Sequence, residues 1–277
     1  MKVILTKENP QLESVLKSIF FQELILILNE SESPTLREIK QKVTDSKLDW
    51  KIDFLVKEKI IQRQDKRYSL LLPIAKREES TNYQEIKQRV FDCLNELTIE
   101  DKKRTLCALY PKEAMQDPFL LDKRSPFTYY QQTANDLLTI VSLSTQEVAF
   151  NLPNYFKQQL KGQESSAFEA VEALLGDVDT SYYLDQIWAI LEKIRKNRRR
   201  IRESIFLNSL HLFQIIEQTD DYWKLAVPVQ AFMENKTPAL PFSDEFSNLS
   251  LIEQRSLLAE LMISFDLENM TILFINR

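Results

Sequence analysis

The densest concentration of a single chemistry in this chain is a run of basic residues. Seven of the ten residues at positions 193–202 are cationic: Lys193, Arg195, Lys196, Arg198, Arg199, Arg200 and Arg202. Like charges on neighbouring helical positions repel each other, so this density indicates an anionic partner. One candidate is phosphate on RNA or DNA. The other is the chain itself, because residues 203–277 hold 11 Asp and Glu against 4 Lys and Arg. We place neutralisation within the chain first and nucleic acid second.

A second set of residues has the chemistry of an interface. Residues 46–62 predict a helix whose core-facing positions recur at steps of three and four: Leu48, Ile52, Leu55 and Val56. At 100° per residue, Trp50, Phe54 and Lys57 then point away from the core. A helix that reads base edges normally offers Arg, Lys, Asn or Gln there, whereas two aromatic rings favour contact with protein. We predict a protein interface at these three residues, with another protein, a second copy, or the chain's own second domain as the partner.

Two scarce residue types argue against an enzyme. The chain has two glycines, Gly162 and Gly176, and one histidine, His211. A phosphate-binding loop needs several close glycines, and Ser-His-Asp catalysis or a zinc site needs a histidine beside a nucleophile or a metal. His211 lies in an apolar run and reads as a core or helix-face residue. The 41 acidic residues single out no catalytic pair. We predict no catalytic residues, no cofactor and no metal.

The N-terminal quarter of the chain predicts three helices followed by a hairpin. A buried helix is expected at residues 12–29, and a second follows Thr35, with Glu38 placed for a capping box. After the third helix, two short extended pieces are expected at 60–61 and 68–72, separated by the polar run 62–67. Lys59 stands where a glycine would normally end the helix, and the hairpin turn must use Asp65.

These residues resemble a known family. Leu48-x-x-x-Ile52-x-x-Leu55-Val56, then Ile60-Ile61-x-Arg63, then Arg67-Tyr68-x-Leu70, is similar to the third helix and wing of bacterial winged helix-turn-helix domains. More loosely, residues 20–74 resemble an uncharacterised family from streptococci and their relatives, which implies no known activity. Wings commonly touch phosphate, so Arg63, Lys66 and Arg67 are candidate nucleic-acid contacts beside Tyr68. A solvated hairpin tip is the alternative, and residues 1–80 carry only 15 cations against 13 anions.

The rest of the chain predicts a larger, mainly helical domain. After a linker at 76–82, helices are expected at 83–97, 154–160 and 165–175, with Gly176 as a stop signal. Short strands at 127–131, 137–143 and 147–152 predict a small antiparallel sheet. A seven-residue apolar repeat from residue 184 to 215 predicts one long helix, or two with a kink. A last helix at 251–265, capped by Ser250 and Glu253, precedes a strand at 269–275.

Together these features predict a mostly helical α+β protein. We expect a winged-helix domain at 1–76 and a helical domain with a small sheet at 83–277, in which a sub-boundary could fall at 162–180. Cys93 and Cys107 lack metal-type spacing, and no signal peptide or membrane span is apparent, which favours the cytoplasm. The predicted function is protein binding or self-association. The alternative is a nucleic-acid-binding regulator that contacts phosphate through the wing and the basic run.

Overall fold

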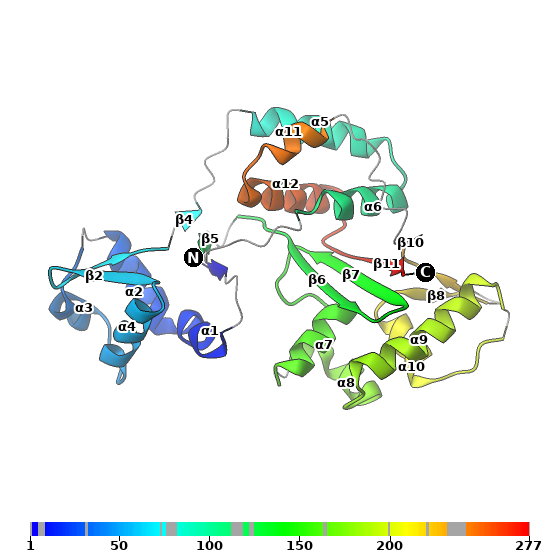
Figure 1. The fold of residues 1–277 in the computed structure, drawn as a ribbon, viewed down its shortest axis with the longest axis horizontal. Coiled ribbons are helices and arrows are strands. Elements are labelled where there is room, and N and C mark those ends of the chain that lie inside the picture. The colour runs from blue at the N-terminus through cyan, green and yellow to red at the C-terminus, as the bar shows by residue number, and fades with distance from the viewer. Residues whose placement is uncertain are drawn as a thin grey trace. The chain divides into compact units, whose positions relative to one another are not determined.

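The computed structural model describes residues 2–4, 9–30, 33–72, 74–75, 82–111, 119–121, 125–162, 165–198, 200–219, 222–231 and 242–276. Its contacts divide the chain into two compact units. The first consists of Met1–Glu78 and Lys112–Ser125, and the second of Glu79–Pro111 and Pro126–Arg277. Helices are more abundant than strands, so the mostly helical α+β class is confirmed (Figure 1).

The first unit opens with four helices. They are α1 (Pro10–Lys17), α2 (Ile19–Glu30), α3 (Leu36–Lys42) and α4 (Leu48–Lys57). The single helix predicted at 12–29 is wrong, because the chain breaks at Ser18, whose backbone is extended. The Ser18 hydroxyl donates to the Val15 carbonyl oxygen at 2.5 Å. Serine side chains compete in this way with the next helical hydrogen bond, and α2 therefore starts afresh.

The predicted capping box of α3 is confirmed. Thr35 Oγ1 accepts the Glu38 backbone N–H at 3.4 Å, and Glu38 Oε2 accepts the Thr35 N–H at 2.6 Å. These two bonds satisfy two of the backbone donors that a helix start leaves unpaired. Thr35 also forms an isolated β-bridge with Arg67, which joins the start of α3 to the hairpin that follows α4.

The third predicted helix is shorter than expected. It ends at Lys57 rather than at residue 62, because Lys59 adopts a left-handed conformation with φ of 58°. The N–H of Ile60 then bonds to the Leu55 carbonyl at 2.9 Å, which closes the helix end. The hairpin strands β2 (Ile61–Gln64) and β3 (Arg67–Leu70) take in most of the polar run that was predicted to be a turn. Asp65 and Lys66 alone form that turn, both with positive φ.

The first unit has its own core and a small second sheet. Residues from α1 to α4 and from both hairpin strands make one apolar cluster, in which Leu24, Ile39 and Leu55 are fully buried. Strands β1 (Lys2–Ile4), β5 (Phe119–Leu121) and β4 (Ile74–Ala75) pair in that order. The sequence predicted domains at 1–76 and 83–277. Strand β5 falls within the second of these ranges, but it pairs with β1 and β4 of the first unit. Residues 76–81 of the predicted linker lie outside the described residues.

The second unit is built on a four-stranded sheet with the order β10-β11-β7-β6. Its strands are β6 (Tyr129–Ala134), β7 (Leu138–Ser144), β10 (Val229–Ala231) and β11 (Asn269–Ile275). The C-terminal strand was predicted correctly and pairs antiparallel with β7. Residues 147–151 form no strand, contrary to expectation. They instead lead into α7 (Leu152–Leu160), where the Asn151 side chain accepts the Asn154 N–H. Strand β10, which was not predicted, runs parallel to β11.

Helices cover both faces of this sheet (Figure 1). Ile140 and Leu273 face a core formed with α7, α8 (Glu169–Leu175), α9 (Thr180–Arg195) and α10 (Ile205–Leu212). Val141 and Ile272 face a second core formed with α5 (Tyr83–Asn95), α6 (Ile99–Leu109), α11 (Ser243–Ser247) and α12 (Leu251–Ser264). Every residue of β7 is buried, as expected of a strand with helices on both sides.

Helices α5, α7, α8 and α12 of this unit follow the predictions, whereas α11 was not predicted. The 3-10 turn η1 (Ser166–Phe168) precedes α8, and Gly176 ends α8 with φ of 61°. The capping box of Ser250 and Glu253 at the start of α12 is confirmed. Strands β8 (Ile216–Gln218) and β9 (Trp223–Leu225) form a further hairpin that was not predicted.

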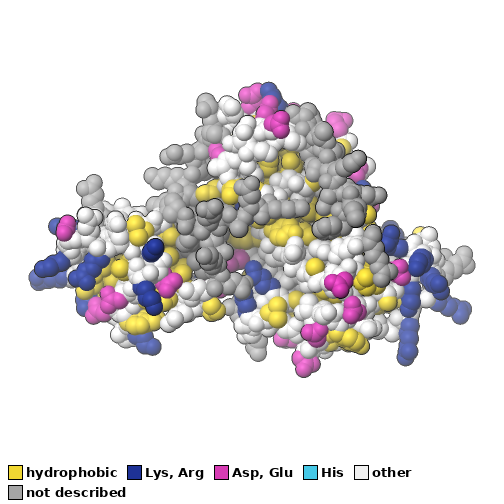
Figure 2. Space-filling view, in the orientation of Figure 1, with side chains coloured by type: hydrophobic (Ala, Val, Ile, Leu, Met, Phe, Trp, Pro, Cys, Tyr) yellow, Lys and Arg dark blue, Asp and Glu magenta, His cyan; other side chains and the backbone are white. Residues whose placement is uncertain are grey.

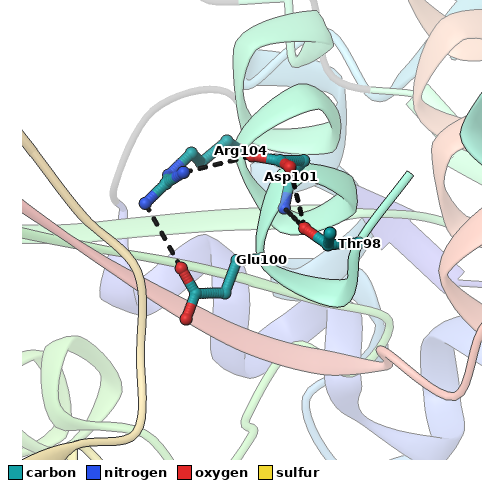
Figure 3. Close-up of polar contacts among 4 residues, drawn as sticks. All are labelled: Thr98, Glu100, Asp101 and Arg104. Atoms are coloured by element: carbon teal, nitrogen blue, oxygen red, sulfur yellow. Dashed lines mark hydrogen bonds and ion pairs between the residues drawn. The ribbon is translucent and has the colours of Figure 1, made fainter.

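Helix α6 was also missed, although its start has a readable signal. Thr98 Oγ1 accepts the backbone N–H of Asp101 at 3.2 Å and donates to that carboxylate at 2.8 Å (Figure 3). Arg104 reaches back to Asp101 at 3.1 Å and to Glu100 at 3.4 Å. The bond from the Asp101 N–H to Thr98 caps the start of the helix, and the ion pairs neutralise the charges of Arg104, Asp101 and Glu100 within one exposed turn.

The seven-residue repeat predicted one long helix, or two with a kink. The structure has two helices, so the single long helix is wrong: α9 ends at Arg195, and α10 begins at Ile205, where the Ser204 side chain caps it. The break has a local cause. Asn197 takes φ of 52°, and the N–H of Arg198 bonds to the Lys193 carbonyl at 3.0 Å. Asparagine tolerates this left-handed geometry better than most residues, and it ends the helix.

No described helix is long and apolar enough to cross a membrane.

Candidate functional site

The outer face of α4 carries the residues that the sequence singled out. Trp50 is 47% exposed, and its ring stacks on Phe54 with centroids 5.3 Å apart and planes 9° from parallel. Phe54 is half-buried and also packs against the core of the first unit. Lys57 is exposed one turn further along. The core side of the helix holds the two rings in place, because Ile52 and Leu55 are fully buried.

Charged residues around this face are arranged in pairs. Lys40 of α3 contacts Asp49 at 2.8 Å, and Lys51 contacts Asp45 at 2.6 Å. The hydrogen bond from Lys51, followed by one from the Lys47 backbone, lowers the pKa of Asp45. That carboxylate therefore stays ionised beside the face. Asp53 is exposed between Trp50 and Lys57 along the helix.

A surface depression of about 580 Å³ adjoins Trp50. It lies where α3 turns into α4 and is lined by Lys40 and residues 43–50. Both signs of charge occur in its wall, as do the apolar side chains of Val43 and Leu48. A mixed lining beside this aromatic pair suits a protein partner better than a partner whose surface is uniformly anionic.

The hairpin does not gather its cations on one side. Tyr68 is 1% exposed and belongs to the core, and the guanidinium of Arg63 lies 5.8 Å from its ring centre. Arg63 is paired with Tyr68 in the hairpin register, whereas Arg67 is one position along and therefore projects from the opposite side. Arg67 Nη1 donates to the Ser33 carbonyl at 3.0 Å. Lys66 is exposed at the turn.

The basic run lies at the end of α9 and in the segment beyond it. All of its described cations are exposed: Lys193, Arg195, Lys196, Arg198, Arg200 and Arg202. Arg199 lies outside the described residues. Lys196 contacts Glu192 at 3.3 Å, and no other described cation of the run has a carboxylate within 4 Å among the described residues. Neutralisation by the acidic residues of 203–277, our first expectation, is therefore not found in the described part of the chain. Figure 2 shows basic side chains projecting at this end of α9.

The histidine and the two cysteines have side chains that could serve as nucleophiles or metal ligands. His211 is exposed on α10, packs edge-on against Trp223 at 5.3 Å, and lies 3.3 Å from the Ile216 carbonyl. Neither Cys93 nor Cys107 takes part in a disulfide bond. No group of three or more metal-type ligands occurs within the described ranges.

Comparison with known proteins gives one match. Residues 2–105 carry a domain of unknown function, DUF1803. No curated protein and no solved structure matches the chain. The DUF1803 match runs through α1–α4 and the hairpin, then through α5, and ends inside α6. DUF1803 thus includes the α4 face, whereas the basic run lies well beyond it.

Proposed function

We propose that this chain is a non-enzymatic binding protein of the cytoplasm whose first unit is a winged helix that associates with a second copy of itself. The order of elements supports this proposal. Helices α2, α3 and α4 are followed by the hairpin β2–β3, and the bridge from Thr35 to Arg67 ties the start of α3 to that hairpin. In a winged helix, α4 corresponds to the helix that contacts the target.

The observation that carries the proposal is the stacked pair of Trp50 and Phe54 on the outer face of α4. Exposed aromatic residues on a rigid helix are the residues that most often dominate the binding energy of protein interfaces. The same face offers little to DNA. Asp53 is exposed there, and a carboxylate at this position would repel phosphate.

A second copy is the occupant that Trp50 and Lys57 together favour. In an antiparallel pairing of two α4 helices about a twofold axis near Phe54, Trp50 of one copy meets Lys57 of the other. A lysine above an indole ring gives a favourable cation–π contact. Phe54 then packs on its own counterpart. The face is therefore self-complementary, with one aromatic and one cationic end in each copy.

The test is sedimentation velocity of the full chain over a range of concentrations. We expect reversible dimers in the wild type, and at least tenfold weaker dimerisation when Trp50 and Phe54 are both replaced by Ala, since each aromatic anchor contributes about 1–2 kcal/mol. Leu26→Ala is the matched control, because Leu26 is 60% exposed on α2 of the same unit.

Three outcomes count against the proposal. A wild type that stays monomeric at every concentration excludes self-association. A dimer that survives the double substitution excludes the α4 face, and equal weakening by Leu26→Ala excludes a specific interface. Reversal of charge by Lys57→Glu provides a second check, since it removes the cation that should lie over Trp50 and should also weaken the dimer.

A further inference from the structure

The segment between α9 and α10 runs back along α9. Phe206 of α10 packs edge-on against Tyr182 and Tyr183, with ring centres 5.9 Å and 5.8 Å apart. Tyr182 and Tyr183 lie at the start of α9, whereas Lys193 and Arg195 of the basic run lie at its end. From Tyr183 to Arg195 the helix rises about 18 Å. The described residues 200–204 form no helix and return the chain over this length, so they are largely extended.

The extended segment presents its arginines in a row. Ile201 is half-buried and packs against the core below. In an extended chain, side chains alternate between two sides, so Arg200 and Arg202 point away from that core. Arg198 lies at the turn, where its N–H bonds to the Lys193 carbonyl, and all three arginines are exposed. Arg200 and Arg202 are about 6.6 Å apart along the chain.

The row is electrostatically unsatisfied. No described carboxylate lies within 4 Å of any of its three arginines, nor of Lys193 or Arg195 at the end of α9. Five positive charges held this close repel one another, and an anionic partner relieves the repulsion while releasing its own counterions.

An aromatic surface lies at the far end of the row. Tyr182 is 54% exposed and its ring is held by Phe206, while Ile205, which precedes Phe206 in the chain, is 40% exposed. A basic track that ends at an exposed ring is the arrangement that binds single-stranded nucleic acid, in which phosphates follow the cations and a base stacks on the ring.

We propose that Arg198, Arg200, Arg202 and Tyr182 bind a single-stranded nucleic acid. The spacing of alternate arginines in an extended chain is close to that of successive phosphates along an extended strand. A duplex cannot use Tyr182, because its bases are already stacked on one another. This site lies in the second unit, and it requires neither the dimer nor the hairpin cations.

The test is fluorescence anisotropy of the full chain with fluorescein-labelled single-stranded RNA, titrated at several salt concentrations. Replacing Arg198, Arg200 and Arg202 by Gln should lower the affinity at least tenfold. It should also reduce the salt slope by about two units, since each contact to a single strand contributes about 0.7. Tyr182→Ala should weaken binding and leave the slope unchanged, because it removes stacking without removing charge.

The matched control replaces Arg63, Lys66 and Arg67 of the hairpin by Gln, which removes the same charge from the first unit. Its affinity and slope should equal those of the wild type. The proposal is overturned if the row variant binds with the wild-type slope, or if both triple variants lose affinity equally. Equal or tighter binding to duplex DNA, or to vesicles that contain phosphatidylserine, overturns the assignment to a single strand.

Discussion

Three tyrosines in the second unit have hydroxyl groups that resist ionisation. Burial raises the pKa of Tyr110 to about 12, and burial likewise raises the pKa of Tyr130 to about 12. Their rings stack at 5.0 Å. Tyr183 is completely buried and donates to or accepts from Ser209 at 2.7 Å, and burial raises its pKa further. The folded state therefore holds these groups in their neutral form.

The stability of this unit should fall between pH 10 and pH 12. An unfolded tyrosine ionises near pH 10, whereas folded Tyr110 ionises near pH 12, so its contribution is fully present below pH 10 and is lost as the pH rises through that interval. The loss from Tyr110 is about 2–3 kcal/mol, because one pKa unit corresponds to about 1.4 kcal/mol. Urea unfolding at stepped pH measures it. Tyr110→Phe should lose less stability over the same interval, and an identical loss would contradict the assignment.

Several described helices end at a residue whose left-handed backbone glycine would adopt with less strain. Four helices end with a non-glycine residue in the left-handed region: Lys59 after α4, Asn197 after α9, Gln214 after α10 and Asp266 after α12. At each end, the next backbone N–H bonds to a carbonyl five residues earlier, as between Ile215 and Leu210 at 2.9 Å. A Cβ atom in this conformation costs about 1–2 kcal/mol, which glycine avoids.

Lys59→Gly and Gln214→Gly should therefore stabilise the protein. Glycine relieves the left-handed strain but has greater freedom in the unfolded chain, so the net gain is about 0.5–1 kcal/mol for each. The measurement is thermal unfolding of each variant. Alanine at the same positions retains the Cβ and serves as the control, and we expect no gain from it. A gain with alanine equal to that with glycine would show that the backbone conformation is not responsible.

The residues that end these helices also explain which helices could be predicted. Thr35 and Ser250 begin helices through side-chain bonds to residues three positions away, and this signal is visible in the sequence. Lys59 carries no such signal, and Asn197, which can end a helix, lies inside a continuing apolar repeat. The predicted helix at 46–62 therefore ran too far, and α9 was joined to α10. The repeat of apolar residues continued across the break because both helices face the same core.

The whole chain consists of two units with separate cores. The first unit buries one apolar cluster, and the second buries two clusters on opposite faces of its sheet. The two units also differ in their proposed roles, since the α4 face belongs to the first and the arginine row to the second. Each unit should therefore fold and bind independently of the other.

Calorimetry of the full chain should show two unfolding transitions. A unit with its own core unfolds cooperatively, so Lys59→Gly should raise the midpoint of one transition and Gln214→Gly that of the other. Tryptophan fluorescence assigns the transitions, because Trp50 lies in the first unit and Trp188, which is largely buried, lies in the second. A single transition that both substitutions shift together would show that the two units unfold as one.

The sequence by itself determined the local features of this protein. Apolar spacing placed most of the helices, capping residues placed several of their starts, and the same spacing predicted that Trp50 is exposed on α4, where Phe54 is half-buried. Only the tertiary structure decided which distant segments meet. Strand β5 pairs with β1 and β4, β10 joins β11, and α9 ends at Arg195, inside the basic run, instead of continuing into α10. The physical reason is range. Caps and helical periodicity act within a few residues, whereas strand pairing and the return of a segment along a helix depend on contacts between residues far apart in the chain.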